Sequence, residues 1–130
     1  MRYMMIVKSA EHFGFPPKPL LDAIGTLSEE AVKASTMIGS GGLLATAQGA
    51  RVKLSKGQVS VIDGPFSEAK EIIGGYAIFE LPSKEEAIKG AVQFMELHKH
   101  HWPGWEGETE VRQMFGPDDM PCNAPERKSQ

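Results

Sequence analysis

The 130-residue sequence contains a single cysteine, Cys122, and therefore no pair that could form an intrachain disulfide. Proteins without disulfides are typical of reducing compartments, so we expect a cytoplasmic protein in which Cys122 is an ordinary thiol. Long hydrophobic runs are also missing, because the apolar stretch at residues 3–7 is followed by Lys8. This stretch is too short for a signal-peptide core or a membrane span, so we predict a strand and no membrane insertion.

The sequence also lacks an excess of positive charge, since 14 Lys and Arg residues face 17 Asp and Glu residues and the net charge is −3. This balance argues against direct nucleic-acid binding. The glycines at residues 39–42 have neither the lysine of a phosphate-binding loop nor the spacing of a dinucleotide loop. With 41% hydrophobic and 24% charged residues, the composition predicts one globular domain. We assign this domain to residues 1–115 and a polar tail to residues 116–130.

Hydrophobic periodicity predicts two helices. Apolar residues recur every three or four positions over residues 18–38, which predicts the first helix. Gly25 weakens such a helix by about 1 kcal/mol, and the capping-box pattern at Thr26 would allow the helix to restart there. A second capping box, at Ser83, begins another helix whose apolar face ends at His98.

Strand patterns alternate with these helices. We predict a hairpin and four further strands, with a flexible glycine turn after the first helix: strands at 3–7, 43–47, 76–81 and 108–115, the hairpin at 51–54 and 58–61, and the turn at 39–42. The order β-α-β-(hairpin)-β-α-β is the ferredoxin-like plan of an α+β fold. Several strands are apolar on both sides while both helices cover only one face of the sheet. A second subunit would cover the other face, so we expect a homodimer that forms a dimeric α+β barrel.

Residues 63–71 read Asp-Gly-Pro-Phe-Ser-Glu-Ala-Lys-Glu and follow the hairpin. Asp63 ends an alternating strand, and its carboxylate could accept hydrogen bonds from the turn. Pro65 fixes its own φ and removes a backbone donor, so this corner is rigid. An ion pair between Glu68 and Lys70 would fix the turn, and a catalytic role for either residue is the alternative interpretation.

The motif at residues 63–71, followed by Gly-Gly-Tyr at 74–76, resembles the DGPF proteins within the YCII-related family, and the similarity extends over residues 1–115. The resemblance implies ferredoxin-like subunits in a dimeric α+β barrel. Most such proteins are uncharacterised, some are associated with extracytoplasmic-function sigma factors, and a few resemble muconolactone-isomerase-like lyases. In those lyases a histidine on the first helix approaches an aspartate at the sheet corner. Asp63 matches the aspartate, whereas residues 18–38 contain no histidine.

Histidines near the end of the second predicted helix are the other candidates for acid–base chemistry. His98 lies on the apolar stripe, so its imidazole either hydrogen-bonds within the core or faces a cavity, and its pKa range suits proton transfer. His98 and His101 would lie one turn apart, but no third metal ligand follows by spacing. We therefore take Asp63 and His98 as the candidate catalytic residues and expect neither a metal nor an organic cofactor.

Five residues are candidates for substrate binding: Arg51, Phe66, Glu68, Lys70 and Trp102. Arg51 could clamp an anionic substrate or face solvent. Trp102 could, with Trp105, roof a small-molecule pocket or close the barrel end. These residues predict proton-transfer chemistry of the lyase or isomerase type on a small, anionic organic molecule. The alternative is a non-catalytic ligand-binding or regulatory partner protein, for instance one that acts with a sigma factor.

Overall fold

The computed structural model describes residues 1–116 and residue 119. Apart from Gly116 and Asp119, the predicted tail at residues 116–130 therefore lies outside the described residues, and so does Cys122. The described chain forms strands, two α-helices and two short 3₁₀ segments (η) in the order β1 (Arg2–Ser9), η1 (Glu11–Phe13), α1 (Lys18–Lys33), β2 (Met37–Gly42), η2 (Thr46–Gln48), β3 (Ala50–Ser55), β4 (Gln58–Asp63), β5 (Ile72–Glu80), α2 (Lys84–His101) and β6 (Gly107–Gln113).

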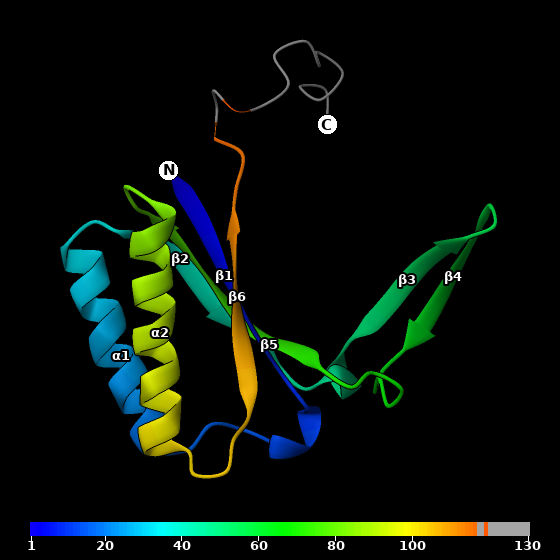
Figure 1. Ribbon diagram of the computed structural model, residues 1–130. Coiled ribbons are helices and arrows are strands. Elements are labelled where there is room, and N and C mark those ends of the chain that lie inside the picture. Colours follow the sequence, from blue (N-terminus) through cyan, green and yellow to red (C-terminus); the bar gives the residue numbers. More distant parts are fainter. Residues whose placement is uncertain (117–118, 120–130) are drawn as a thin grey trace.

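A four-stranded sheet in the order β2-β5-β1-β6 forms the centre of the fold, and all of its neighbouring strands are antiparallel. Both helices lie on one side of this sheet (Figure 1). The predicted ferredoxin-like α+β plan is confirmed. β3 and β4 pair with each other in a separate sheet that projects from the other side of the molecule (Figure 1). We call this hairpin, residues 50–63, the arm.

The core lies between β1 and α2. Tyr3 and Met5 project from β1 onto Ala87 and Ala91 of α2, and Phe79, Leu81 and Val111 pack around them. These small alanines let the helix approach the sheet closely, while the large side chains of the strand fill the space between the layers. Side chains alternate along a strand. Met4 and Ile6, which follow Tyr3 and Met5, therefore face the side of the sheet that has no helix.

The first helix ends five residues earlier than the sequence predicts, at Lys33 instead of residue 38. Ser35 adopts a left-handed conformation with φ of 58°. The Ser35 amide donates to the Val32 carbonyl at 3.0 Å, and the Thr36 amide donates to the Ala31 carbonyl at 2.9 Å, which satisfies the last carbonyls of the helix. A serine occupies the position that glycine usually takes, so no residue pattern marks this end of the helix. The helix runs without a break through Gly25.

Residues 39–42, predicted as a flexible turn, form most of β2, whereas residues 43–47, predicted as a strand, form a loop and the start of η2. One glycine of β2, Gly41, is packed tightly against the neighbouring strand, whereas a Cβ at Gly39 or Gly42 would meet nothing within 4 Å. A Cβ on Gly41 would lie 3.0–3.2 Å from ring atoms of Tyr76, and one on Gly75 would lie 3.1 Å from the Gly41 carbonyl oxygen. Bare backbone on β2 thus allows the Tyr76 ring to lie across it, a known way to stabilise glycine in a strand.

The second helix begins where the sequence predicts. The Glu86 amide donates to Oγ of Ser83 at 3.2 Å, and Glu85 and Glu86 place negative charge in the first turn. The helix continues to His101, so His98 lies in its last turn. This end of α2 adjoins the start of β6, where the candidate site is found.

Candidate functional site

Two groups of candidate residues lie at the same end of the four-stranded sheet. Here Ser9, at the end of β1, pairs with Ile72, which begins β5, and with Gly107, which begins β6. We call the first group the motif cluster; its members are Glu11, Thr46, Arg51, Phe66 and Glu68. We call the second group the His98 pocket; it is formed by Met95, His98, Lys99, Trp102, Gly104, Trp105 and Gly107.

The η1 segment lies between the two groups and contacts both. Its first residue, Glu11, hydrogen-bonds to Thr46 in the motif cluster. Its last residue, Phe13, has its ring centroid 6.4 Å from that of Trp105 in the His98 pocket. The short segment that follows β1 therefore connects the motif to the aromatic residues after α2.

Thr46 is the centre of the motif cluster. Its hydroxyl donates to Oε1 of Glu11 at 2.6 Å, and its backbone amide donates to Oε2 of the same carboxylate at 2.6 Å. The Phe66 amide in turn donates to the Thr46 hydroxyl at 3.0 Å. The hydroxyl and amide of Thr46 stabilise the ionised carboxylate and lower the pKa of Glu11 from its usual value. Glu11 and Thr46 were absent from the sequence-predicted site, because no motif or spacing marks either residue.

The glycine of the motif is fixed by close backbone contact. The Gly64 amide donates to the Gly49 carbonyl at 2.8 Å, and the Gly64–Pro65 peptide bond is cis. A Cβ on residue 64 would overlap the carbonyl oxygen of Thr46. Only glycine fits here, so the corner predicted from the sequence depends on contact with η2 as well as on the proline.

Arg51, Phe66 and Glu68 are brought together by the structure. The Arg51 guanidinium forms an ion pair with the Glu68 carboxylate and lies 4.6 Å from the centroid of the Phe66 ring. The predicted pairing of Glu68 with Lys70 is therefore wrong, since Arg51 takes the place of Lys70. Lys70 is exposed and forms no ion pair with any described residue. The Nε of Arg51 is buried and has no hydrogen-bond partner among the described residues, so the ion pair with Glu68 leaves one donor of the guanidinium unused.

Asp63 ends β4 and is exposed. Its side chain makes neither a hydrogen bond nor an ion pair with any of the residues 1–116, and the turn bonds suggested by the sequence are not made. It forms no contact of this kind with His98, which is buried at the end of α2. Within one chain, the structure therefore does not bring the two candidate catalytic residues together.

His98 is only 5% exposed although it lies in the last turn of α2. Its Nδ1 lies 3.0 Å from the Phe94 carbonyl oxygen. A carbonyl can only accept, so Nδ1 carries the proton and Nε2 of the neutral ring has a free lone pair. Burial lowers the pKa of His98, and the bond to Phe94 opposes this shift only partly. His98 is therefore neutral at physiological pH.

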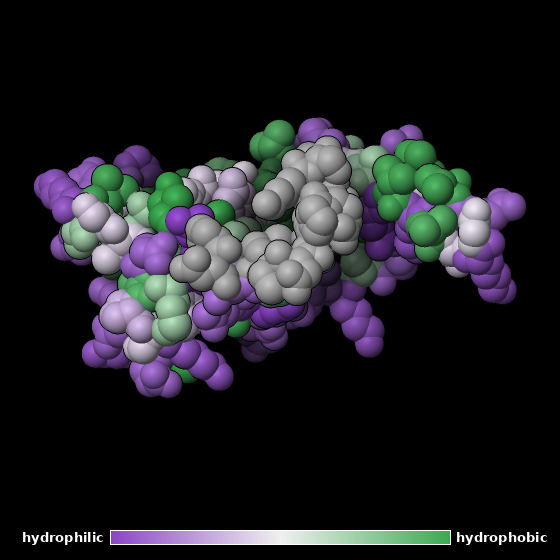
Figure 2. Space-filling model, turned by 90° about the horizontal axis from the view of Figure 1, so that it is seen from above, coloured by the Kyte–Doolittle hydropathy of each residue, from purple (hydrophilic) through white to green (hydrophobic). Residues whose placement is uncertain are grey.

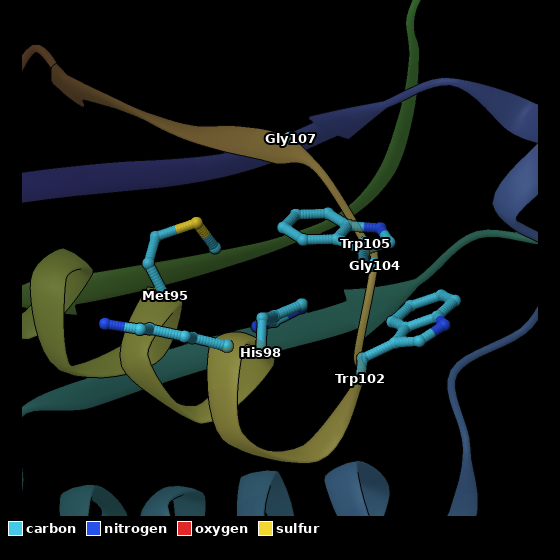
Figure 3. Close-up of a pocket in the computed structure, with 7 residues that line it drawn as sticks. Met95, His98, Trp102, Gly104, Trp105 and Gly107 are labelled. Carbon is cyan, nitrogen blue, oxygen red and sulfur yellow. The ribbon is translucent and has the colours of Figure 1, made fainter.

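Two tryptophans form walls of the pocket beside His98 (Figure 3). The Trp105 ring centroid is 4.5 Å from that of His98, and the centroids of Trp102 and Trp105 are 5.8 Å apart with ring planes inclined by 24°. A tight turn positions them: the Trp102 amide donates to the His98 carbonyl at 2.9 Å, and Gly104 has a φ of 84°. Side chains of this region surround an open hollow of about 330 Å³.

Gly107 determines where the Trp105 ring lies. A Cβ at residue 107 would come within 2.5 Å of two Trp105 ring atoms and of the Lys8 carbonyl oxygen. The indole therefore packs over the bare backbone at the start of β6. Trp105 was considered in the sequence beside Trp102, but only its packing on Gly107 and His98 makes it a wall of the pocket.

Two features are absent from the part of the chain that the structure describes. No group of three or more His, Cys, Asp or Glu side chains there could hold a metal ion. Neither described helix combines the length and apolarity needed to cross a membrane. The expected cytoplasmic location stays a prediction.

Comparison with known proteins identifies a family but no curated relative. The YCII-related domain family matches residues 1–94. The matched segment contains the whole motif at residues 63–71 and ends before His98 and the two tryptophans. No curated protein matches the chain. The match covers most of the described residues, and it agrees with the motif and the ferredoxin-like sheet: the chain belongs to the YCII-related family.

Proposed function

We propose that the chain binds a small, flat organic molecule in the His98 pocket and that His98 accepts a proton from this molecule. The observation that carries the proposal is the 3.0 Å contact between Nδ1 of His98 and the Phe94 carbonyl oxygen. This bond uses the only proton of the neutral ring, so Nε2 is an acceptor. A neutral imidazole with a free lone pair is suited to a ligand that carries an O–H, N–H or acidic C–H group.

The residues around His98 support a flat ligand that becomes anionic. Trp102 and Trp105 offer large aromatic surfaces on which a planar ring can stack. Lys99 belongs to the same lining, and its ammonium would favour the negative charge that proton transfer leaves on the ligand. A hollow of about 330 Å³ falls at the lower end of the range for small-molecule sites. The base and the counter-charge are thus both side chains, and no organic cofactor is needed.

The chemistry that follows from this arrangement is a one-base proton transfer of the isomerase or lyase type. The proposal gives Asp63 no part in it, because that carboxylate lies exposed on the arm. Arg51, Phe66 and Glu68 support the fold around the motif and are not required for binding. A regulatory protein that acts with a sigma factor is the alternative proposal, and it predicts ligand binding without turnover.

The test uses 2-naphthol as a flat probe with a hydroxyl donor and naphthalene as the same ring system without the donor. The chain has two tryptophans, and both line the pocket, so their indole N–H signals in ¹⁵N–¹H NMR spectra report binding directly. We expect both signals to shift with 2-naphthol. Replacement of His98 by phenylalanine, which keeps a flat ring and removes the acceptor, should weaken 2-naphthol binding about tenfold, because one hydrogen bond is lost.

The matched control is His100→Phe, because His100 lies on the same helix and is exposed. Binding of 2-naphthol to this variant should equal that of the wild type. Naphthalene should bind the wild type and His98→Phe equally. If neither indole signal moves, or if His98→Phe and His100→Phe bind 2-naphthol equally well, the proposed role of His98 is wrong.

A further inference from the structure

One face of the arm is entirely apolar between its turn and its base. In the hairpin Val52 pairs with Val61 and Leu54 pairs with Val59, so all four side chains lie on the same face. Their exposures are 67–73%. Figure 2 shows the hydrophobic surface that gathers on the arm. We call these four residues the arm stripe.

The opposite face of the arm has a different character. Lys53 pairs with Ser60, and Arg51 pairs with Ile62, so charged and hydroxyl groups predominate there. A two-stranded hairpin with one apolar face is marginally stable in water unless that face is covered. An exposed apolar patch with a polar border is typical of a surface that binds another protein. The one-sided pattern therefore indicates a partner on the arm stripe.

The four-stranded sheet has a second uncovered apolar surface. Met4 pairs with Ile78 and Ile6 pairs with Tyr76, and these residues alternate with those that face the helices. They therefore project from the face of the sheet that no helix covers, and the arm extends on that side of the molecule (Figure 1). We call this second surface, Met4, Ile6, Tyr76 and Ile78, the open sheet face.

The size of these surfaces indicates that they act together. One face of the arm, about 20 Å long and 10 Å wide, offers only about 200 Å² of projected area. The open side of the four-stranded sheet, about 19 Å wide and about 23 Å long, adds roughly 450 Å² of projected area. A stable interface buries about 800 Å² of accessible surface on each partner, and accessible area exceeds projected area. Neither surface is large enough alone, whereas the two together approach the required size.

We propose that a second copy of this chain occupies both surfaces. The open sheet faces of the two copies pack against each other, and the arm stripe of each copy packs against the other copy beside them. A two-fold dimer needs a self-complementary surface, and each chain offers one apolar arm and one apolar sheet face. The sequence predicted contact between the sheets alone; the arm is the new element. Asp63 pairs with Ala50 on the same face as the arm stripe, so this unpaired carboxylate of the motif faces the other copy.

The test measures the dimer dissociation constant of the full chain by sedimentation equilibrium. We expect a wild-type dimer, and we expect Val52→Lys with Val59→Lys to raise the dissociation constant at least about 100-fold, since two charges would be buried in the interface. The matched control, Ser60→Lys, places the same charge on the polar face of the same strand and should leave the dissociation constant within about threefold. Far-UV circular dichroism establishes that each variant is folded.

A second measurement needs no variant. Hydrogen exchange of the wild-type amides at residues 50–63 should become faster when the protein is diluted below the dissociation constant, because the arm loses its cover. A wild type that is monomeric up to about 100 µM overturns the proposal and leaves the arm to a different partner. A dimer that the double variant retains as well as Ser60→Lys does, or arm exchange that is independent of dilution, also overturns it, because the sheets alone would then form the interface.

Discussion

The motif cluster and the His98 pocket lie at the same end of the sheet and differ in how their polar groups are bonded. In the motif cluster Thr46, Glu11 and the Phe66 amide bond to one another, and Arg51 is paired with Glu68 while its buried Nε has no partner among the described residues. In the His98 pocket one ring nitrogen of His98 is bonded to its own helix, and the other has no hydrogen-bond partner among the described residues. The motif side chains thus bond mainly to one another, whereas the ring nitrogen that could act as a base lies outside the motif.

This difference separates the part of the sequence that identifies the family from the part that we expect to carry chemistry. The family match ends at residue 94, while His98, Trp102 and Trp105 follow it. A corner in which three chain segments meet needs particular residues for steric reasons alone. A pocket built from one helix end and one turn can vary its side chains without disturbing that corner.

The largest expected effect is that of Gly64→Ala, which tests whether the motif is a packing requirement. The added methyl group would overlap the Thr46 carbonyl oxygen, which belongs to the backbone and cannot rotate away. We expect a loss of at least about 3 kcal/mol in the free energy of unfolding, measured by urea denaturation. The matched control is Gly74→Ala, because a Cβ there meets nothing within 4 Å. The control should change the same quantity by less than about 1 kcal/mol. Equal losses in the two variants would show that the close contact at Gly64 is unimportant.

A smaller effect is expected from protonation of His98. It tests whether the imidazole in the His98 pocket is desolvated. Burial lowers the pKa of His98 in the folded chain below the ordinary value of 6.5, so the unfolded chain takes up the proton first as the pH falls. The stability that the neutral ring provides is present above pH 6.5 and is lost as the pH falls through the folded pKa. Urea denaturation at pH 7.5 and 5.5 should show this loss in the wild type and a smaller loss in His98→Phe.

The exposed His100→Phe variant again serves as the control and should lose stability with acid as the wild type does. The carboxylates of Glu11 and Glu110 have pKa values lowered from 4.5 and so titrate below this pH window. An NMR titration of the His98 ring adds a direct reading. A midpoint above 6.5 would mean that the ring is not desolvated, and the contrast between the two regions would then disappear.

The regular parts of the fold could be predicted because their signals are local. Alternation marked the arm, and the capping box at Ser83 marked the start of α2. The β2 strand was missed because closely spaced glycines are typical of a turn, and the contact that fits Gly41 to the strand is made by Tyr76, a residue distant in the sequence. The early end of α1 was missed because Ser35 has a left-handed conformation that serine rarely adopts.

Prediction of the site from the sequence was limited in the same way. The sequence singled out His98 from its place on an apolar stripe, and the burial of that residue agrees with the stripe. It gave no means of finding Thr46 or Glu11, since the bonds between them join segments 35 residues apart. The sequence-based prediction also paired Glu68 with its neighbour Lys70, because a single sequence shows which residues are close along the chain but not which are close in space. The true partner, Arg51, lies on the arm.

The smallest expected effect concerns this last pair and sharpens the interpretation of the motif. Glu68 is 61% exposed on its side chain, and an ion pair that water can reach contributes little to stability. We expect Glu68→Gln to lower the free energy of unfolding by less than about 1 kcal/mol, no more than Glu29→Gln on the exposed surface of α1. A loss comparable to that of Gly64→Ala would mean that charge, and not backbone fit, holds the motif together. If the loss is small, the residue that the motif requires for stability is its glycine, because Thr46 leaves no room for a side chain there. The charged residues that follow can then vary without unfolding the corner.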